Sequence, residues 1–127
     1  MTVEIPFESW KSFCEELTAH VEAMVDIRVQ SNGDLRLVAQ DVRLQSASFD
    51  ENSDACNSVL VLEFGTVGHK ASQLRVVGPA RLILRKERGD DHFHLLEMPA
   101  ESELTVITFR PGISPAILKD LDLPVRT

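Results

Sequence analysis

Alternating hydrophobic and polar residues mark several short stretches of the chain, and the clearest of them covers residues 74–87. Leu82 and Leu84 fall on one side of a predicted strand there, because successive side chains point to opposite faces of a strand. The other side of this strand carries Arg81, Ile83 and Arg85. Gly78-Pro79 interrupts the pattern, and a proline, which has no N–H group to donate, predicts an edge or a corner of the sheet.

The hydrophobic pattern predicts further strands over residues 24–30, 35–39, 42–49, 59–64, 92–98 and 104–110. Asn32-Gly33 lies between the first two of these strands and is the pair that a tight hairpin turn favours. The apolar positions change from odd to even between Val38 and Asp41, which indicates a β-bulge that bends the strand. Residues 59–64 are almost entirely apolar, and such a run predicts a strand covered on both faces.

Two helices flank the predicted strands. The first covers residues 5–20, with Pro6 at the first helical position, where its missing N–H group costs no hydrogen bond. Apolar residues recur at spacings of three and four on the stripe formed by Trp10, Phe13, Cys14, Leu17 and Val21. Trp10 is therefore expected between the helix and the sheet. A short second helix begins at Ser114-Pro115, a capping serine followed by a proline in the first turn.

These elements predict an α+β fold with the N-terminal helix packed on a bent antiparallel β-meander or small barrel of six to seven strands. The short C-terminal helix completes the predicted fold. A chain of 127 residues fits a single domain over residues 1–127. A chain of this length can bury enough surface to fold without a metal ion or a disulfide.

The charge of the chain limits what it is expected to bind. Its net charge is −7 and its 13 basic residues are dispersed, so we expect no nucleic acid and no membrane surface as a partner. No apolar run approaches the ~20 residues that cross a bilayer, and the N-terminus lacks the pattern of a signal peptide. Cys14 and Cys56 have no metal-type spacing. We therefore expect a cytoplasmic protein with reduced thiols.

Five segments, spread over most of the chain, together resemble the pattern of a known protein family. They are Ile5-Pro6 with Trp10 and Phe13, Asp41-Val42-Arg43-Leu44, residues 59–64, residues 74–84 with Pro79, and Ile107-Thr108-Phe109-Arg110. Together they resemble a family of small bacterial proteins catalogued as a domain of unknown function. The resemblance implies a small soluble α+β protein from bacteria, and it implies no activity, cofactor or catalytic residue.

Two short clusters are candidates for a binding site. His92 and His94 share one face of a predicted strand, and zinc sites are built from such pairs with further ligands. The alternative is two imidazoles on a solvated face, and we expect no metal ion and no other cofactor. Arg81 and Arg85 also share a face and could hold an anion or a partner's carboxylates. Alternatively, these arginines pair across strands with the protein's own acids.

The strand over residues 24–30 is the predicted edge for self-association. It contains no proline, and Asp26 and Arg28 lie on its outer face, so two copies could form a weak homodimer with Asp26 opposite Arg28. The sequence carries no local signature of nucleophilic catalysis. We therefore expect a non-catalytic interaction module that binds an unknown protein partner or itself. The alternatives are a small-ligand-binding β-barrel domain and an enzyme of unknown class.

Overall fold

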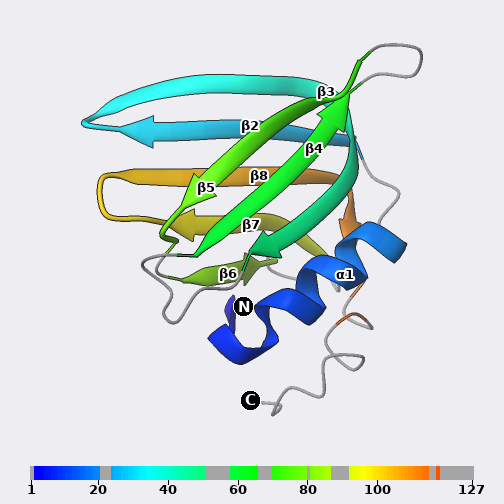
Figure 1. Ribbon diagram of the computed structural model, residues 1–127. Coiled ribbons are helices and arrows are strands. Elements are labelled where there is room, and N and C mark those ends of the chain that lie inside the picture. Colours follow the sequence, from blue (N-terminus) through cyan, green and yellow to red (C-terminus); the bar gives the residue numbers. More distant parts are fainter. Residues whose placement is uncertain are drawn as a thin grey trace.

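Eight strands and one α-helix make up the described part of the chain, shown in Figure 1. The computed structural model describes residues 2–20, 24–50, 58–65, 70–79, 81–86, 92–114 and 117. The chain begins with β1 (Thr2–Ile5), a short 3₁₀ helix η1 (Phe7–Ser9) and the helix α1 (Trp10–His20). The remaining strands are β2 (Met24–Ser31), β3 (Asp34–Asp50), β4 (Val59–Gly65), β5 (Ser72–Val77), β6 (Leu82–Arg85), β7 (Phe93–Pro99) and β8 (Glu103–Ile113).

All eight strands belong to one antiparallel sheet in the order β1-β6-β7-β8-β2-β3-β4-β5. Strands β2 to β5 form one meander and β6 to β8 another, and the pairing of β2 with β8 joins the two. The structure confirms the predicted N-terminal helix on an antiparallel sheet. The predicted count of six to seven strands is too low, and the sheet is open, with β1 and β5 at its two ends.

Strands β5 and β6 are not neighbours in the sheet, although only a few residues separate them in the chain: β5 is at one end, and β6 is the second strand from the other end. Gly78-Pro79 therefore separates two strands that do not pair with each other, instead of interrupting one strand. Gly78 has a φ of 63°, a conformation that glycine adopts without a steric cost. Its N–H group donates a hydrogen bond to the carbonyl of Ser58 at 2.9 Å. This contact fixes the point where the chain leaves β5, which is an edge strand as the proline predicts.

β3 runs from Asp34 to Asp50 but changes its partner along the way. Its first part pairs with β2, and its second part, from Arg43 onward, pairs with β4. The register with β2 shifts twice, and Asp41 has a φ of 52°, which residues other than glycine rarely adopt. These irregularities confirm the bulge predicted between Val38 and Asp41. They bend β3, so the sheet curls toward α1 (Figure 1).

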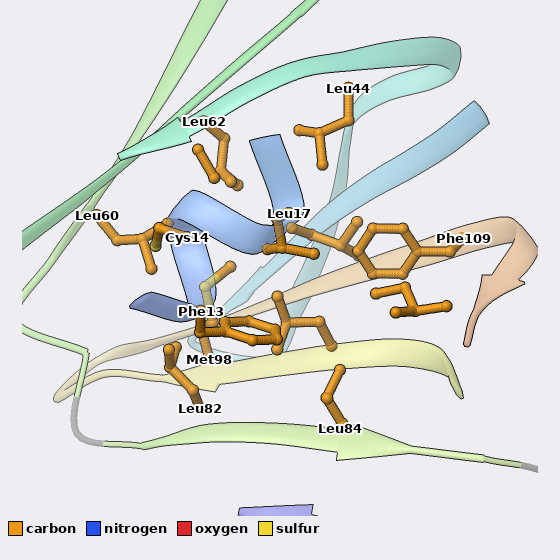
Figure 2. Close-up of a cluster of buried hydrophobic side chains, with 14 of the residues drawn as sticks. Phe13, Cys14, Leu17, Leu44, Leu60, Leu62, Leu82, Leu84, Met98 and Phe109 are labelled. Carbon is orange, nitrogen blue, oxygen red and sulfur yellow. The ribbon is translucent and has the colours of Figure 1, made fainter. Parts of the chain in front are cut away.

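α1 packs on the concave face of this sheet and fills it. Its core residues are Trp10, Phe13, Cys14 and Leu17, each at most 2% exposed. Figure 2 shows three of them meeting apolar side chains from the surrounding strands. The hydroxyl of Thr18 accepts a hydrogen bond from the N–H group of Ala47 at 2.9 Å, which ties α1 to β3. The predicted helical stripe is thus confirmed, except that Val21 lies outside the described residues.

The first helix begins later than predicted. Residues 2–5 form β1, which pairs with β6 and places Ile5 opposite Leu82. Pro6 has extended dihedral angles (φ −61°, ψ 147°), so the helical turns begin only at Phe7. Four residues are too few to display a period, and a strand of this length therefore has no clear signal in the sequence.

β4 also differs from its prediction. Leu60, Leu62 and Phe64 are buried, whereas Val59, Val61 and Glu63 are half-buried. The strand is therefore fully covered on one face only, because its outer residues lie on the convex side of the sheet.

The structure does not show the predicted C-terminal helix. Beyond Ser114 it describes only Ile117, which is buried in the core. The rest of that segment, like Cys56, lies outside the described residues. Within the described ranges, no helix is both long enough and apolar enough to span a membrane.

Candidate interaction surface

Apolar side chains point outward on the β2–β3 hairpin. Leu35 and Leu37 of β3 are 66% and 49% exposed. Leu104 and Val106 of β8 lie on the same face of the sheet and are half-buried. With the two β2 residues between them, these side chains form one surface, the hairpin patch: Arg28, Gln30, Leu35, Leu37, Leu104 and Val106. On the concave face of the sheet, α1 packs against the second part of β3.

The Asn32-Gly33 turn explains why the leucines point outward. Both residues have positive φ angles, 52° and 84°, as the predicted two-residue hairpin turn requires. The register set by this turn places the two leucines opposite Gln30 and Arg28. Residues opposite each other share a face, and the residues of β2 that alternate with Gln30 and Arg28 are the buried ones. The leucines therefore cannot reach the core without a shift in register.

β3 also leaves part of its backbone without a strand partner at the patch. Among the described strands, residues 34–42 pair with β2 on one side only, because β4 joins at Arg43. The residues flanking a two-residue turn exchange both of their hydrogen bonds, so Leu35 and Leu37 direct their N–H and C=O groups away from β2. The hairpin patch thus offers apolar side chains and backbone hydrogen-bonding groups in one place.

A cluster of charged side chains holds the base of the hairpin. Asp26 of β2 is buried, and its carboxylate accepts a hydrogen bond from the N–H group of Asp41 at 2.9 Å. The guanidinium of Arg110, on β8, donates to both oxygens of Asp26, at 2.5 and 3.1 Å, and pairs with the Asp41 side chain. The cluster therefore connects β2, β3 and β8 where β3 bends.

These hydrogen bonds stabilise the charged form of Asp26. Donation from Arg110 is the largest cause, followed by the N–H group of Asp41, and together they hold the pKa of Asp26 at about 2, below its ordinary value of 3.8. Asp26 is thus a buried anion with its partners in place. It has a structural role in orienting the hairpin and is not available to a second molecule.

The prediction that β2 is a free edge is wrong. β2 pairs with β3 on one side and with β8 on the other, so it is an interior strand. Asp26 is bound to Arg110, and Arg28 faces outward between Leu37 and Val106. Two copies cannot pair through β2 unless this sheet opens. An alternating strand without proline has the same sequence pattern at an edge and in the middle of a sheet, which explains the error.

Arg81, just before β6, and Arg85, at the end of β6, form ion pairs with acidic side chains of the same protein. Arg81 pairs with Glu4, and Arg85 contacts Glu97 at 2.7 Å and donates to the hydroxyl of Thr2 at 3.3 Å. These pairs are at least partly exposed to solvent, and exposed ion pairs contribute little to stability. Arg81 and Arg85 lie at the β1 end of the sheet, so the structure does not bring them together with the hairpin patch.

His92 and His94 lie beside β8 at Gly112. A Cβ atom on Gly112 would come within 2.9 Å of the Cβ of His92 and 3.0 Å of the Cε1 of His94. His92 is exposed just before β7, and His94 is half-buried on that strand. Within the described residues, no group of three or more His, Cys, Asp or Glu side chains could hold a metal ion. That the chain binds no metal stays a prediction.

The concave side of the sheet is occupied by protein side chains (Figure 2). The indole N–H of Trp10 donates to the carbonyl of Ile5 at 2.8 Å, which fixes the ring in the core. Burial raises the pKa of the Cys14 thiol to about 12, so this thiol stays protonated at neutral pH and is a poor nucleophile. The described residues therefore present their accessible groups mainly on the outer face of the sheet.

Sequence reasoning missed the outward position of the two leucines and the role of Arg110. The signal for the leucines was present, because the Asn-Gly turn fixes the pairing and sets both opposite polar residues of the preceding strand. No comparable signal identifies Arg110, since its partner Asp26 is distant in the chain and no spacing connects the two residues.

Comparisons with family models, curated proteins and solved structures find no match to this chain. The resemblance to a bacterial family therefore stays a prediction carried by the five quoted segments. Function is accordingly inferred from the hairpin patch and its surroundings.

Proposed function

We propose that the protein is a non-catalytic interaction module that binds a partner protein through the hairpin patch. The observation that carries the proposal is the pair Leu35 and Leu37, exposed at 66% and 49% on a stretch of β3 that pairs with β2 alone among the described strands. Exposed apolar groups rimmed by polar ones are typical of protein-binding surfaces.

The composition of the hairpin patch suits a protein partner. The leucines supply apolar area, the neighbouring Arg28 can donate hydrogen bonds, and the outward backbone groups of β3 can pair with an added strand or loop. The Asp26–Arg110–Asp41 cluster fixes the base of the hairpin, so little conformational freedom is lost when a partner binds.

We place this module in the cytoplasm, because Cys14 is a free, buried thiol and the sequence is acidic. The same acidity supports a protein partner over nucleic acid or an anionic membrane. A small-ligand site in the interior has less support, since the side chains of α1 occupy the concave face of the sheet.

Capture from a lysate of the source organism, followed by binding measurements, tests the proposal. The wild type, the double variant Leu35→Glu/Leu37→Glu and the control Met24→Glu are immobilised in turn. Met24 is 41% exposed at the end of β2 that is farther from the turn, so the control introduces a glutamate at an exposed apolar position outside the hairpin patch. We expect a protein retained by the wild type and the control and lost by the double variant.

The captured protein is then purified and titrated by calorimetry against all three chains, each checked for folding by circular dichroism. A charged residue in the centre of an apolar contact should weaken binding by about tenfold or more. Equal affinity of the double variant and the wild type, or no partner at any protein concentration, would show that the hairpin patch is not a binding surface.

A further inference from the structure

The free edges of the described sheet differ in how well they could accept another strand. β1 has only four residues, and its Glu4 pairs with Arg81, so charged side chains line that edge. The unpaired part of β3 is interrupted by two register shifts, which distort the row of N–H and C=O groups. β5 pairs with β4 in unbroken register over all six of its residues, so its other edge is the regular one.

We propose that two copies of this chain pair antiparallel through the free edge of β5. β5 contains no proline, since Pro79 comes after its last residue. Arg75 is the one charged residue within it. Natural edge strands are guarded by prolines, bulges, inward-pointing charges or charged side chains along the edge; β5 lacks the first three and carries a single outward charge, Arg75. Val77 adds an apolar side chain that is 65% exposed. The interface would join two open sheets into one.

A two-fold axis restricts the register of this pairing. Residues opposite each other across the two strands must point to the same face of the sheet. Because side chains alternate between faces, the two-fold axis must then pass between one residue of β5 and the same residue of the second copy. An axis at Arg75 would set two arginines against each other, which is unfavourable. An axis at Leu74 sets Leu74 against its copy on the inner face. It also sets Gln73 against the second copy's Arg75 on the outer face.

The Leu74 register is also complementary in charge. Gln73 donates a hydrogen bond to Glu63 of β4 at 3.0 Å, so a carboxylate lies directly behind it on the outer face. The second copy's Arg75 therefore approaches Gln73 with Glu63 one strand further on. Strands lie ~4.8 Å apart, which puts the two charged residues ~10 Å apart at their backbones, within reach of two long side chains. The symmetry creates this pair twice.

Sedimentation equilibrium of the full chain over a wide concentration range tests the proposal. We expect the wild type to show a monomer–dimer equilibrium. Arg75→Glu and Glu63→Arg should each weaken the dimer by about tenfold, because two repulsive contacts replace two attractive ones. The double variant Arg75→Glu/Glu63→Arg should restore the dimer, which a merely structural role of either residue would not do.

Two further variants complete the test. Gln73→Arg, at an exposed position, should weaken the dimer by setting Arg against Arg75, and it stands in if a charge-reversal variant fails to fold. Leu37→Glu, on the hairpin patch, should leave the dimer unchanged, so failure of this inference is distinguishable from failure of the proposed function. A wild type that is monomeric at every concentration, or a dimer unaffected by Arg75→Glu and Gln73→Arg, overturns the inference.

Discussion

At the scale of single residues, Trp10 contributes most clearly to the core. Its ring packs edge-on against Phe7 with centroids 5.1 Å apart, and it also contacts Phe49 at 5.4 Å. We expect Trp10→Ala to lower the free energy of unfolding by about 3–5 kcal/mol, because the residue leaves a cavity that the strands cannot close. Urea denaturation followed by circular dichroism measures this loss. Trp10→Phe, which keeps an aromatic ring, is the control and should cost clearly less; an equal cost would contradict the cavity argument.

Asp26 gives the chain a defined sensitivity to acid. Its folded pKa of about 2 lies below its ordinary value of 3.8, so ionised Asp26 stabilises the fold above about pH 4. This contribution disappears as the pH falls from 4 to 2. We therefore expect Asp26→Asn to be less stable than the wild type at pH 7, with the difference vanishing near pH 2. Thermal unfolding across this range measures it, with the exposed Asp50→Asn as control; a difference independent of pH would argue against the ion pair.

The position of a residue in the fold could be predicted from the sequence when the residues that it contacts are near it in the chain. Trp10 was placed correctly, because helical spacing alone puts it on the buried stripe. The outward leucines were predictable in principle, since the Asn32-Gly33 turn fixes their opposite residues. The role of Arg110 was not predictable, because only the pairing of β2 with β8 in the folded sheet brings it to Asp26. The same unpredicted pairing explains why β2 was wrongly expected to be an edge strand.

At the scale of elements, Gly112 shows how closely β7 and β8 approach at their bulge. The register between these strands shifts there, and a Cβ on Gly112 would lie 2.9 Å from the carbonyl oxygen of Phe93. We expect Gly112→Ala to destabilise the protein by about 1–3 kcal/mol, since the backbone must move to admit the methyl group. Thermal unfolding tests this. Gly65→Ala is the matched control, because its nearest neighbour would be 3.4 Å away; equal losses in the two variants would exclude the close approach as the cause.

Most elements, but not their order, could be predicted from the sequence. Alternation identified β2 and β7 nearly to their ends, the apolar run identified β4, residues 104–110 of β8 were also predicted as a strand, and the change of parity located the bulge in β3. The strand order could not follow, because alternation tells which face a residue occupies and carries no information about the neighbouring strand. The stretch of clearest alternation accordingly proved to contain two strands, β5 and β6, that are not neighbours in the sheet.

At the scale of the whole molecule, the curled sheet and α1 supply a continuous core from residues of both meanders. We therefore expect a chelator such as EDTA to leave the melting temperature unchanged, since His92 and His94 are not joined by a third ligand among the described residues. Differential scanning fluorimetry with and without EDTA, together with elemental analysis of the purified protein, measures this. Stoichiometric zinc whose removal lowers the melting temperature would contradict the expectation.

The joining of the two meanders by β2 and β8 has a consequence for synthesis on the ribosome. The chain emerges at ~5–20 residues per second, so the local meander from β2 to β5 can form well before β8 has left the ribosome. Until then the apolar residues Val25, Ile27 and Val29 lie along an open strand edge. β2, an interior strand in the finished protein, is thus the nascent chain's exposed template for aggregation. Its protection depends on how quickly the last strand arrives.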